Sequence, residues 1–156
     1  YDQNKVSEIF SVDPDNVLLN KARRRAKLNN INLNIESLSA EELPFESNSF
    51  DTVVSTYTLC SIKNAEKALA EVNRVMKNGS KFIFSEHGKA PDENILKWQK
   101  RLNPIWSRIA GGCHLDIDIP SIISQSNFKI PEIQSTYVPG PKFAAYHYWG
   151  YATANK

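Results

Sequence analysis

The chain has 156 residues, enough for one domain with a sizeable buried core. Its content of 41% hydrophobic and 23% charged residues is ordinary for a globular protein, and the formal net charge of +2 gives no strong attraction to nucleic acid or to an anionic membrane. No apolar run approaches the roughly 18 residues of a transmembrane helix, so we expect neither a nucleic-acid partner nor a membrane-spanning segment.

The two cysteines, Cys60 and Cys113, stand far apart in the sequence. This pattern predicts reduced thiols rather than a disulfide framework, and with no basic-then-apolar start in view it favours a cytoplasmic protein. The spacing of the cysteines and the three histidines matches no familiar metal-ligand pattern, so the sequence predicts no metal site.

The first predicted elements are a strand and a helix. Residues 6–12 are mostly apolar and predict a buried strand that ends at Asp13. Residues 16–28 carry apolar residues at helical spacing and predict a helix. Basic side chains crowd the rest of this helix, and we interpret them as a solvated face rather than a nucleic-acid site, because no aromatic or glycine-rich motif accompanies them.

Two further strands are predicted next. Residues 31–35 alternate between apolar and polar side chains, as a half-buried strand does. After a loop at Pro44 and a polar turn at residues 47–49, residues 50–57 are β-branched and aromatic and predict an interior strand. Because open α/β sheets bind ligands at the carboxyl ends of their strands, we expect a site at about residues 56–61.

The alternation of helix and strand then continues. Asn64 suits the N-cap of a helix and Gly79 suits the residue that follows its C-terminus. Residues 81–85 predict the next strand, which ends at Glu86 and His87. The order strand, helix, strand, strand, helix, strand predicts a parallel, doubly wound α/β sheet.

The last third of the chain predicts a long amphipathic helix and an antiparallel end. Residues 92–109 share an apolar face, and we expect Pro104 to kink or split this helix. Its residues Trp98 and Trp106 indicate a lid that covers a pocket. The alternative is a helix whose large side chains serve only for packing. The prediction ends with a glycine turn at residues 111–114, a helix capped by Asp118, and two strands at residues 128–138 and 144–152. The connection between the two strands is short, which requires them to be antiparallel.

Residues 40–55 contain an acidic loop, Leu-Pro-Phe, a short polar turn and Phe-Asp opening a hydrophobic strand. This motif resembles the class I S-adenosylmethionine (SAM) dependent methyltransferases, in the branch that includes the ubiquinone/menaquinone-biosynthesis enzymes. From residue 6 to the end, the chain also resembles a sub-branch of phospholipid or thiol methyltransferases. The resemblance implies a Rossmann-like, three-layer α/β/α fold with a mostly parallel sheet and an antiparallel last strand.

The resemblance implies SAM as the cofactor and assigns candidate roles to particular side chains. The expected cofactor-binding residues are Asp13, Pro14, Ser39, Ala40, Glu41, Thr56 and Tyr57, with Asp13 accepting hydrogen bonds from the ribose hydroxyls. The expected catalytic residues are His87, as the base, and Glu86; the expected substrate-binding residues are Trp98, Trp106 and His114. Ser39 stands where the family often has Asp or Asn, and the alternative role for Asp13 or Asp15 is to cap the following helix.

The family also has a first strand and a glycine-rich loop, and this sequence contains no GxGxG. We therefore expect residues 1–156 to form a partial SAM-dependent methyltransferase domain that acts on a small-molecule or lipid-like substrate: a thiol, a headgroup amine or a quinone-like ring. The alternative is an inactive fragment or binding module of the same fold. A nicotinamide dehydrogenase is a weaker third hypothesis, because it explains neither the motif at residues 40–55 nor the antiparallel last strand. The sequence predicts no oligomeric state.

Overall fold

The computed structural model describes residue 2 and residues 4–154. The chain divides after Pro44 into two compact units, called here the N-terminal unit (up to Pro44) and the C-terminal unit (from Phe45). Each unit has its own sheet, of two strands and four strands respectively. The predicted mixed α/β architecture is confirmed, but the described strands form two sheets instead of one. The segment at residues 37–49 that links the units contains no strand.

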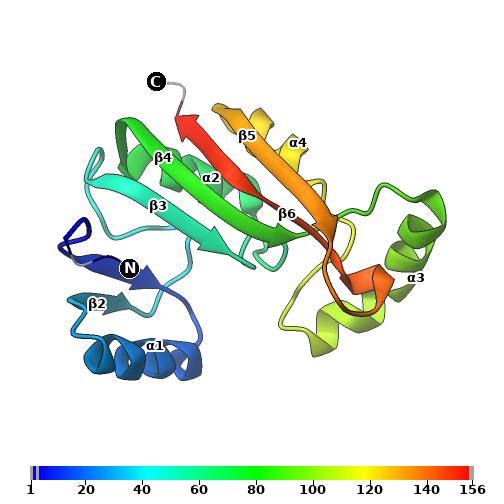
Figure 1. Cartoon of the computed structure of the whole chain (residues 1–156), viewed down its shortest axis with the longest axis horizontal. Coiled ribbons are helices and arrows are strands. Elements are labelled where there is room, and N and C mark those ends of the chain that lie inside the picture. Colours follow the sequence, from blue (N-terminus) through cyan, green and yellow to red (C-terminus); the bar gives the residue numbers. More distant parts are fainter. Residues whose placement is uncertain (1, 3, 155–156) are drawn as a thin grey trace. The chain divides into compact units, whose positions relative to one another are not determined.

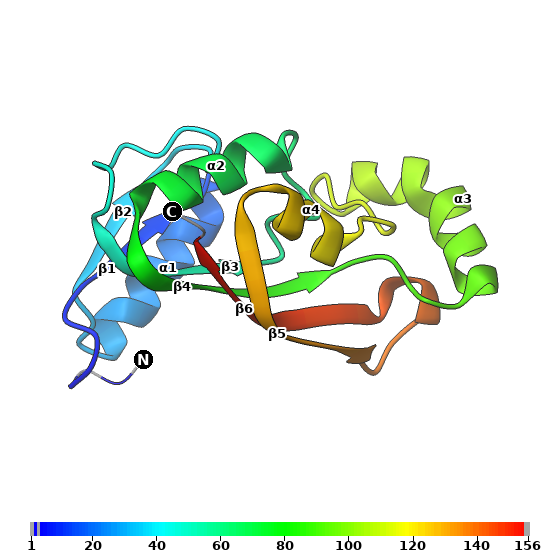
Figure 2. The ribbon, with the colours of Figure 1, turned by 90° about the horizontal axis from the view of Figure 1, so that it is seen from above.

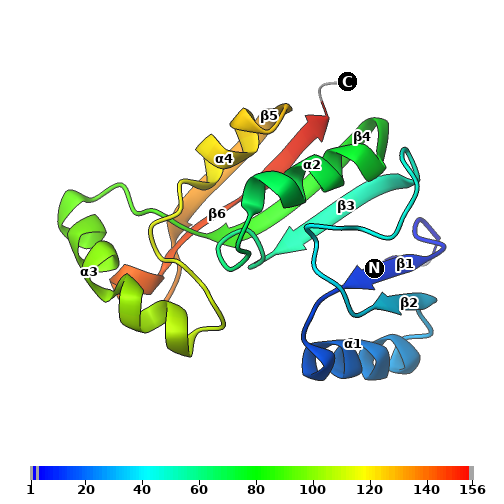
Figure 3. The same ribbon diagram turned by 180° about the vertical axis from the view of Figure 1, so that it is seen from behind.

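The N-terminal unit is a single β-α-β motif (Figure 1). Strands β1 (Ile9–Val12) and β2 (Leu33–Glu36) pair in parallel, and helix α1 (Asn16–Leu28) forms the crossover that parallel pairing requires. Figure 3 shows α1 running alongside the two strands. The predicted bounds of the helix are confirmed, while both strands are shorter than or shifted from the predicted ranges.

The C-terminal unit is built on the sheet order β3-β4-β6-β5. Strands β3 and β4 are parallel, and β6 runs antiparallel to both of its neighbours, β4 and β5. The predicted antiparallel last strand is therefore confirmed. The elements are β3 (Phe50–Thr56), α2 (Ala65–Val75), β4 (Met76–His87), α3 (Glu93–Ile109), α4 (Ile119–Gln125), β5 (Phe128–Tyr137), the 3₁₀ turn η1 (Lys142–Ala144) and β6 (Tyr146–Ala154).

The core of the C-terminal unit lies between its sheet and two helices. Helices α2 and α4 cover one face of the sheet, and α3 lies beyond its end (Figure 2). Alternate residues of β4, Phe82 and Phe84, point into this core, where they join fully buried residues such as Leu69 and Ile123. None of the helices in the part of the chain that the structure describes is long and apolar enough to cross a membrane.

One local prediction is wrong, and for another, a kink or a split at Pro104, the structure excludes the split. Helix α2 ends at Val75, earlier than a C-terminal Gly79 requires, because Met76 is already extended and fully buried in the core. Gly79 instead lies inside β4, with a left-handed φ of 75°. Pro104 does not split α3, which is one helix from Glu93 to Ile109 and changes direction partway along in Figure 1. A single proline removes only one backbone hydrogen bond, so the helix continues past it.

Candidate functional site

The segment that follows β3 is held in place by one buried carboxylate. Glu86, near the end of β4, is fully buried. It accepts hydrogen bonds from the Ser55 hydroxyl at 2.7 Å and from the backbone N–H groups of Thr58 at 3.1 Å and Cys60 at 3.4 Å. These contacts join the carboxyl ends of the neighbouring strands β3 and β4, which is where the sequence predicted a site.

Burial raises the pKa of the Glu86 carboxyl, and the hydrogen bonds from Ser55 and the following backbone amides counteract part of that rise. The carboxylate oxygens are thus already occupied by donors of the protein itself. This arrangement makes Glu86 a positioning residue for the segment after β3. Its predicted role as a catalytic group stays a prediction.

Tyr57 is the residue at which the chain leaves β3, and its backbone is strained. Its φ of 53° is left-handed, a conformation that a bulky residue adopts only when the surroundings enforce it. Its N–H donates to Ser85 O at 3.0 Å, and its hydroxyl lies 3.1 Å from His147 Nε2 on β6. Tyr57 is 57% exposed, so the strained turn leaves an aromatic residue accessible to solvent at the end of β3.

Three sulfur and nitrogen ligand groups meet beside this segment: Cys60 after β3, His87 at the end of β4 and Cys113 after α3. The two Sγ atoms are 3.5 Å apart, and Cys113 Sγ lies 3.4 Å from His87 Nδ1. The shared hydrogen bond with Cys60 lowers the pKa of Cys113 to about 7, although burial opposes the shift, while the pKa of Cys60 is raised. Sequence spacing did not reveal this cluster, because its members come from three separate segments.

His87 Nε2 is buried and has no hydrogen-bond partner among the described residues. The ring itself is 4% exposed and its centroid lies 5.7 Å from that of His147. His87 is therefore placed at the carboxyl end of β4 as predicted, but in a buried environment dominated by thiols. Its predicted role as a general base stays a prediction.

The predicted cofactor residues of the N-terminal unit lie at the carboxyl ends of its two strands. Asp13 follows β1 and accepts a hydrogen bond from Asp15 N–H at 2.7 Å through Oδ1. Capping of α1 belongs instead to Asp15, whose side chain accepts from Val17 N–H and Leu18 N–H. The alternative role in capping thus applies to Asp15 and leaves Asp13 available for another partner. Pro14, between the two aspartates, is exposed.

The loop after β2 contains the other three predicted cofactor residues of this unit. Ser39 Oγ accepts the Glu41 N–H at 3.2 Å, and the Ser39 carbonyl accepts the Glu42 N–H at 3.2 Å. Ser39 therefore stabilises a tight turn that places half-buried Ala40 at its tip. The predicted contact of this turn with adenine stays a prediction.

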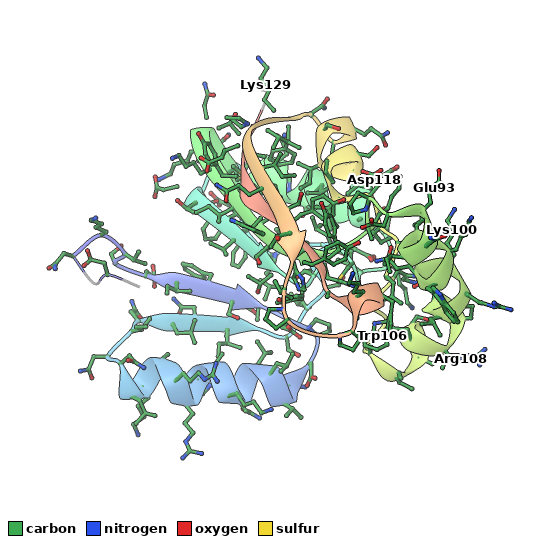
Figure 4. All side chains as sticks on the ribbon, turned by 45° about the vertical axis from the view of Figure 1, so that its right-hand side comes forward. Glu93, Lys100, Trp106, Arg108, Asp118 and Lys129 are labelled. Atoms are coloured by element: carbon green, nitrogen blue, oxygen red, sulfur yellow. The ribbon has the colours of Figure 1, made fainter. Side chains whose placement is uncertain are left out.

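The structure does not gather the three predicted substrate residues in one place. Trp98 is 54% exposed and lies beneath the Arg101 guanidinium at 5.9 Å. Trp106 packs edge-on against Phe143 with ring centroids 5.7 Å apart, on the side of α3 facing the sheet, whereas the labelled charged residues of α3 point outward (Figure 4). His114 is exposed. Only Trp106 thus has the inward placement expected of a pocket residue.

A cavity of about 410 Å³ lies elsewhere in the C-terminal unit, between α2 and the turn from α4 to β5. Its lining contains none of the predicted site residues. It is formed by Glu66, Ala70, Asn73, Arg74, Gln125, Ser126 and Asn127. The cavity therefore offers no support for the predicted site at the carboxyl ends of the strands.

Comparisons with known proteins agree with this fold. A family model described as a methyltransferase domain matches residues 1–84. Thiol S-methyltransferase TMT1B of Rattus norvegicus is 39% identical over 94 residues, which cover 60% of this chain and 38% of the rat protein. Ubiquinone/menaquinone biosynthesis C-methyltransferase UbiE of Brucella canis is 31% identical over 134 residues, which cover 82% of this chain and 49% of that protein.

Among solved structures, a SAM-dependent methyltransferase from Methanosarcina mazei is similar with a TM-score of 0.75 over 94% of this chain and 82% of that one. The sequence identity to that structure is 15%, so the likeness concerns the fold. The chain spans about half or less of the length of the curated relatives named above.

Proposed function

This chain belongs to the methyltransferase-domain family, with the fold of the class I SAM-dependent enzymes, and from that premise we propose that it transfers a methyl group from SAM to a small thiol. When bound, SAM supplies an electrophilic methyl group on a sulfonium centre. The chain must then hold the cofactor and place a nucleophile in line with that methyl group, because orientation supplies much of the rate in such a reaction.

Asp13 is the residue we propose for the ribose of the cofactor. Its Oδ1 atom is used by Asp15 N–H, and no hydrogen bond reaches Oδ2 from the described residues. An ionised carboxylate only accepts hydrogen bonds, so this half-buried group fits two hydroxyl donors. The turn at residues 39–41 is proposed for the adenine, where the small side chain of Ala40 permits a close approach by a flat ring.

The observation that carries the proposal is the segment fixed by Glu86. Three donors on this segment and on β3 converge on one buried carboxylate, and Tyr57 is held in a left-handed conformation beside them. A segment with satisfied, buried hydrogen bonds keeps its shape without a ligand, which is the preorganisation that positioning requires. Thr56 and Tyr57 are the two exposed residues that this framework presents at the end of β3.

A thiol is the acceptor that we favour over a headgroup amine or a quinone-like ring. The rat relative is a thiol S-methyltransferase, and the Brucella canis relative is a C-methyltransferase. A thiol becomes a strong nucleophile by losing a single proton, so the reaction requires only positioning and an acceptor for that proton.

Titration calorimetry with S-adenosylhomocysteine tests the cofactor assignment, using Asp13→Ala and its neighbour Asp15→Ala as a matched pair. We expect Asp13→Ala to weaken binding roughly 10- to 100-fold, because hydrogen bonds to a charged acceptor are lost. Asp15→Ala should keep the affinity of the wild-type chain while lowering the free energy of unfolding by about 1 kcal/mol, because only the cap of α1 is removed.

Equal weakening in the two variants would contradict the role of Asp13. No binding by the folded wild-type chain would favour the alternative, an inactive fragment or binding module. Thermal unfolding gives an independent check, since a ligand at 100 times its dissociation constant stabilises the fold by roughly 2.7 kcal/mol.

The acceptor is tested by methyl transfer from SAM to an alkanethiol, a phospholipid headgroup amine and a hydroquinone, each at the same concentration. We expect turnover with the thiol to exceed that with the other two at least roughly tenfold, a difference of about 1.4 kcal/mol in activation free energy. Preference for either of the others would reject the thiol while leaving the cofactor assignment intact.

A further inference from the structure

The cluster of Cys60, His87 and Cys113 has the composition of a metal site. Among the described residues, these form the one group of three or more cysteine, histidine or acidic side chains whose ligand atoms all lie within 4.8 Å of one another. The residues come from the segment after β3, the end of β4 and the turn after α3. All three belong to the C-terminal unit, whose sheet and core hold the first two in fixed positions.

The distances match those between ligands of one tetrahedral ion. Zinc–thiolate bonds of about 2.3 Å and zinc–imidazole bonds of about 2.0–2.1 Å place two sulfurs about 3.8 Å apart, and a sulfur and a nitrogen about 3.6 Å apart. Here the two Sγ atoms are 3.5 Å apart, and Cys113 Sγ is 3.4 Å from His87 Nδ1. The remaining pair, Cys60 Sγ and the His87 ring nitrogen, lies within 4.8 Å, so rotation of these side chains would bring all three atoms onto one ion.

The surroundings of the cluster support a ligand role rather than a packing role. Cys60 is 1% exposed and His87 is 4% exposed, and His87 directs Nδ1 towards Cys113 Sγ at 3.4 Å. A thiol is only a weak hydrogen-bond partner. A zinc ion would therefore give this buried imidazole nitrogen a stronger partner than the sulfur does.

The neighbouring carboxylate does not compete for the ion. Glu86 precedes His87 in β4, but its oxygens accept hydrogen bonds from Ser55, Thr58 and Cys60. The available ligands are therefore two sulfurs and one imidazole nitrogen. Soft thiolates together with imidazole favour zinc over magnesium or calcium, which take oxygen ligands.

We propose that Cys60, His87 and Cys113 bind Zn²⁺ as a three-ligand site whose fourth position accepts an external ligand. Three protein ligands and one open position are the arrangement of catalytic rather than structural zinc sites. Cys113 is partly exposed, which gives access to the ion from solvent. The assignment gives His87 a role as ligand, different from the general base predicted from sequence.

The proposed fourth ligand is a small thiol, and this part rests on the proposed function. A thiol that binds zinc does so as the thiolate, with its proton released to solvent, because the ion stabilises the deprotonated sulfur. Zinc would thus assist the loss of this proton at the cluster itself, where the oxygens of the neighbouring Glu86 already accept hydrogen bonds from the protein. The binding of zinc itself does not depend on methyl transfer and is tested separately.

The experiment is equilibrium dialysis of the reduced, tag-free chain against Zn²⁺, with the bound metal measured by mass spectrometry. Co²⁺ replaces Zn²⁺ in a second measurement, because thiolate-bound cobalt shows a charge-transfer absorption that histidine-only or carboxylate binding lacks. The variants are Cys60→Ser, Cys113→Ser and His87→Gln. His114→Gln is the matched control, since His114 adjoins Cys113 in sequence but is exposed.

We expect one equivalent of zinc in the wild-type chain and in His114→Gln. Each ligand variant should bind zinc roughly 100-fold or more weakly, because losing even an outer-shell partner costs 10- to 100-fold. Circular dichroism identifies variants that remain folded, and the cobalt band of the wild-type chain supports the proposal even if a variant unfolds. Addition of an alkanethiol should shift that band, which tests the open position.

Three results would overturn the zinc site. They are zinc bound in the reduced wild-type chain at far less than one equivalent, the absence of a thiolate–cobalt band, and equal affinity in His114→Gln and the ligand variants. Air oxidation of Cys60 and Cys113 to a disulfide at the same rate with and without zinc would also count against it, because bound zinc protects thiolates from oxidation. Zinc binding without thiol methylation would reject the proposed function alone.

Discussion

The two units bury their helices to very different extents. Helix α1 of the N-terminal unit has two buried residues, Leu19 and Ala26, whereas the shorter helix α2 of the C-terminal unit buries Ala68, Leu69, Val72 and Val75. The first sheet has two strands and the second has four, with α2 and α4 together on one face. A two-stranded sheet offers too little surface to enclose a core, so the second unit holds most of the buried apolar area.

The residues of the candidate site are divided between these two units, which differ in how well they are packed. The proposed ribose and adenine contacts stand on short strands and an exposed turn of the N-terminal unit. The segment held by Glu86 and the Cys60–His87–Cys113 cluster stand on the larger sheet, where a packed core restricts movement. We therefore expect the C-terminal unit to keep its site geometry under conditions that already loosen the N-terminal unit.

The largest effect is expected from a matched pair of core truncations, Leu69→Ala in α2 and Leu19→Ala in α1. Both side chains are buried, at 0% and 3% exposure, so the transfer free energy lost is alike. Leu69→Ala should lower the free energy of unfolding of the C-terminal unit by about 3–5 kcal/mol, because it leaves a cavity in a close-packed core. Leu19→Ala should cost nearer 2 kcal/mol, because Leu19 lies outside the large core cluster to which Leu69 belongs.

Native-state hydrogen exchange measured residue by residue checks this pair. Leu19→Ala should accelerate exchange in the amides of residues 9–36 and leave those of β4 and β6 unchanged. Uniform acceleration throughout both units would mean that the chain unfolds as one cooperative body, and the contrast between the units would not extend to their stability.

The next effect concerns carboxylates in the two units. Glu86→Ala removes a buried acceptor of three hydrogen bonds and should destabilise the C-terminal unit by about 3 kcal/mol, because the donors left behind are buried and unpaired. Glu8 of the N-terminal unit accepts from Asn34 at 2.6 Å but is exposed, so Glu8→Ala should cost less than about 0.5 kcal/mol.

Urea unfolding of the two glutamate variants gives both values. The midpoint should move clearly for Glu86→Ala and hardly at all for Glu8→Ala, with similar slopes against denaturant concentration. A small effect of Glu86→Ala would show that water replaces the carboxylate readily and that the segment after β3 is less rigid than its hydrogen bonds indicate.

The smallest effect is a pH dependence confined to the C-terminal unit. Burial raises the pKa of Tyr148 to about 12, and its hydroxyl donates to Lys89 O at 2.6 Å. The unfolded chain loses this proton near pH 10, earlier than the folded chain, so the stabilising contribution is complete below about pH 10 and is lost as the pH rises towards 12. Tyr148→Phe should flatten this part of the decline.

Urea unfolding of the wild-type chain and Tyr148→Phe at several pH values in this window measures the difference. Other tyrosines titrate in the same range, and comparison of the two proteins cancels their contribution. If the free energy of unfolding declined equally steeply with pH in both proteins, the Tyr148 phenol would be as accessible in the folded chain as in the unfolded one.

The sequence by itself determined the elements and the family. Helix α1 matches the prediction because its apolar spacing and the cap at Asp15 are local features, and the antiparallel β6 follows from a connection too short for parallel pairing. The resemblance of residues 40–55 to class I methyltransferases depends likewise on a contiguous motif, and the family match over residues 1–84 agrees with it.

Only the tertiary structure decided how distant side chains meet. Glu86 lies near the end of β4 and was predicted as a catalytic group, yet its contacts are made by donors in β3 and the segment after it, about 30 residues earlier in the chain. The cluster of Cys60, His87 and Cys113 is invisible to any spacing rule, because sheet pairing and the turn after α3 bring its members together. Local pattern specifies elements, whereas sites made by contacts between elements emerge only when those elements pack.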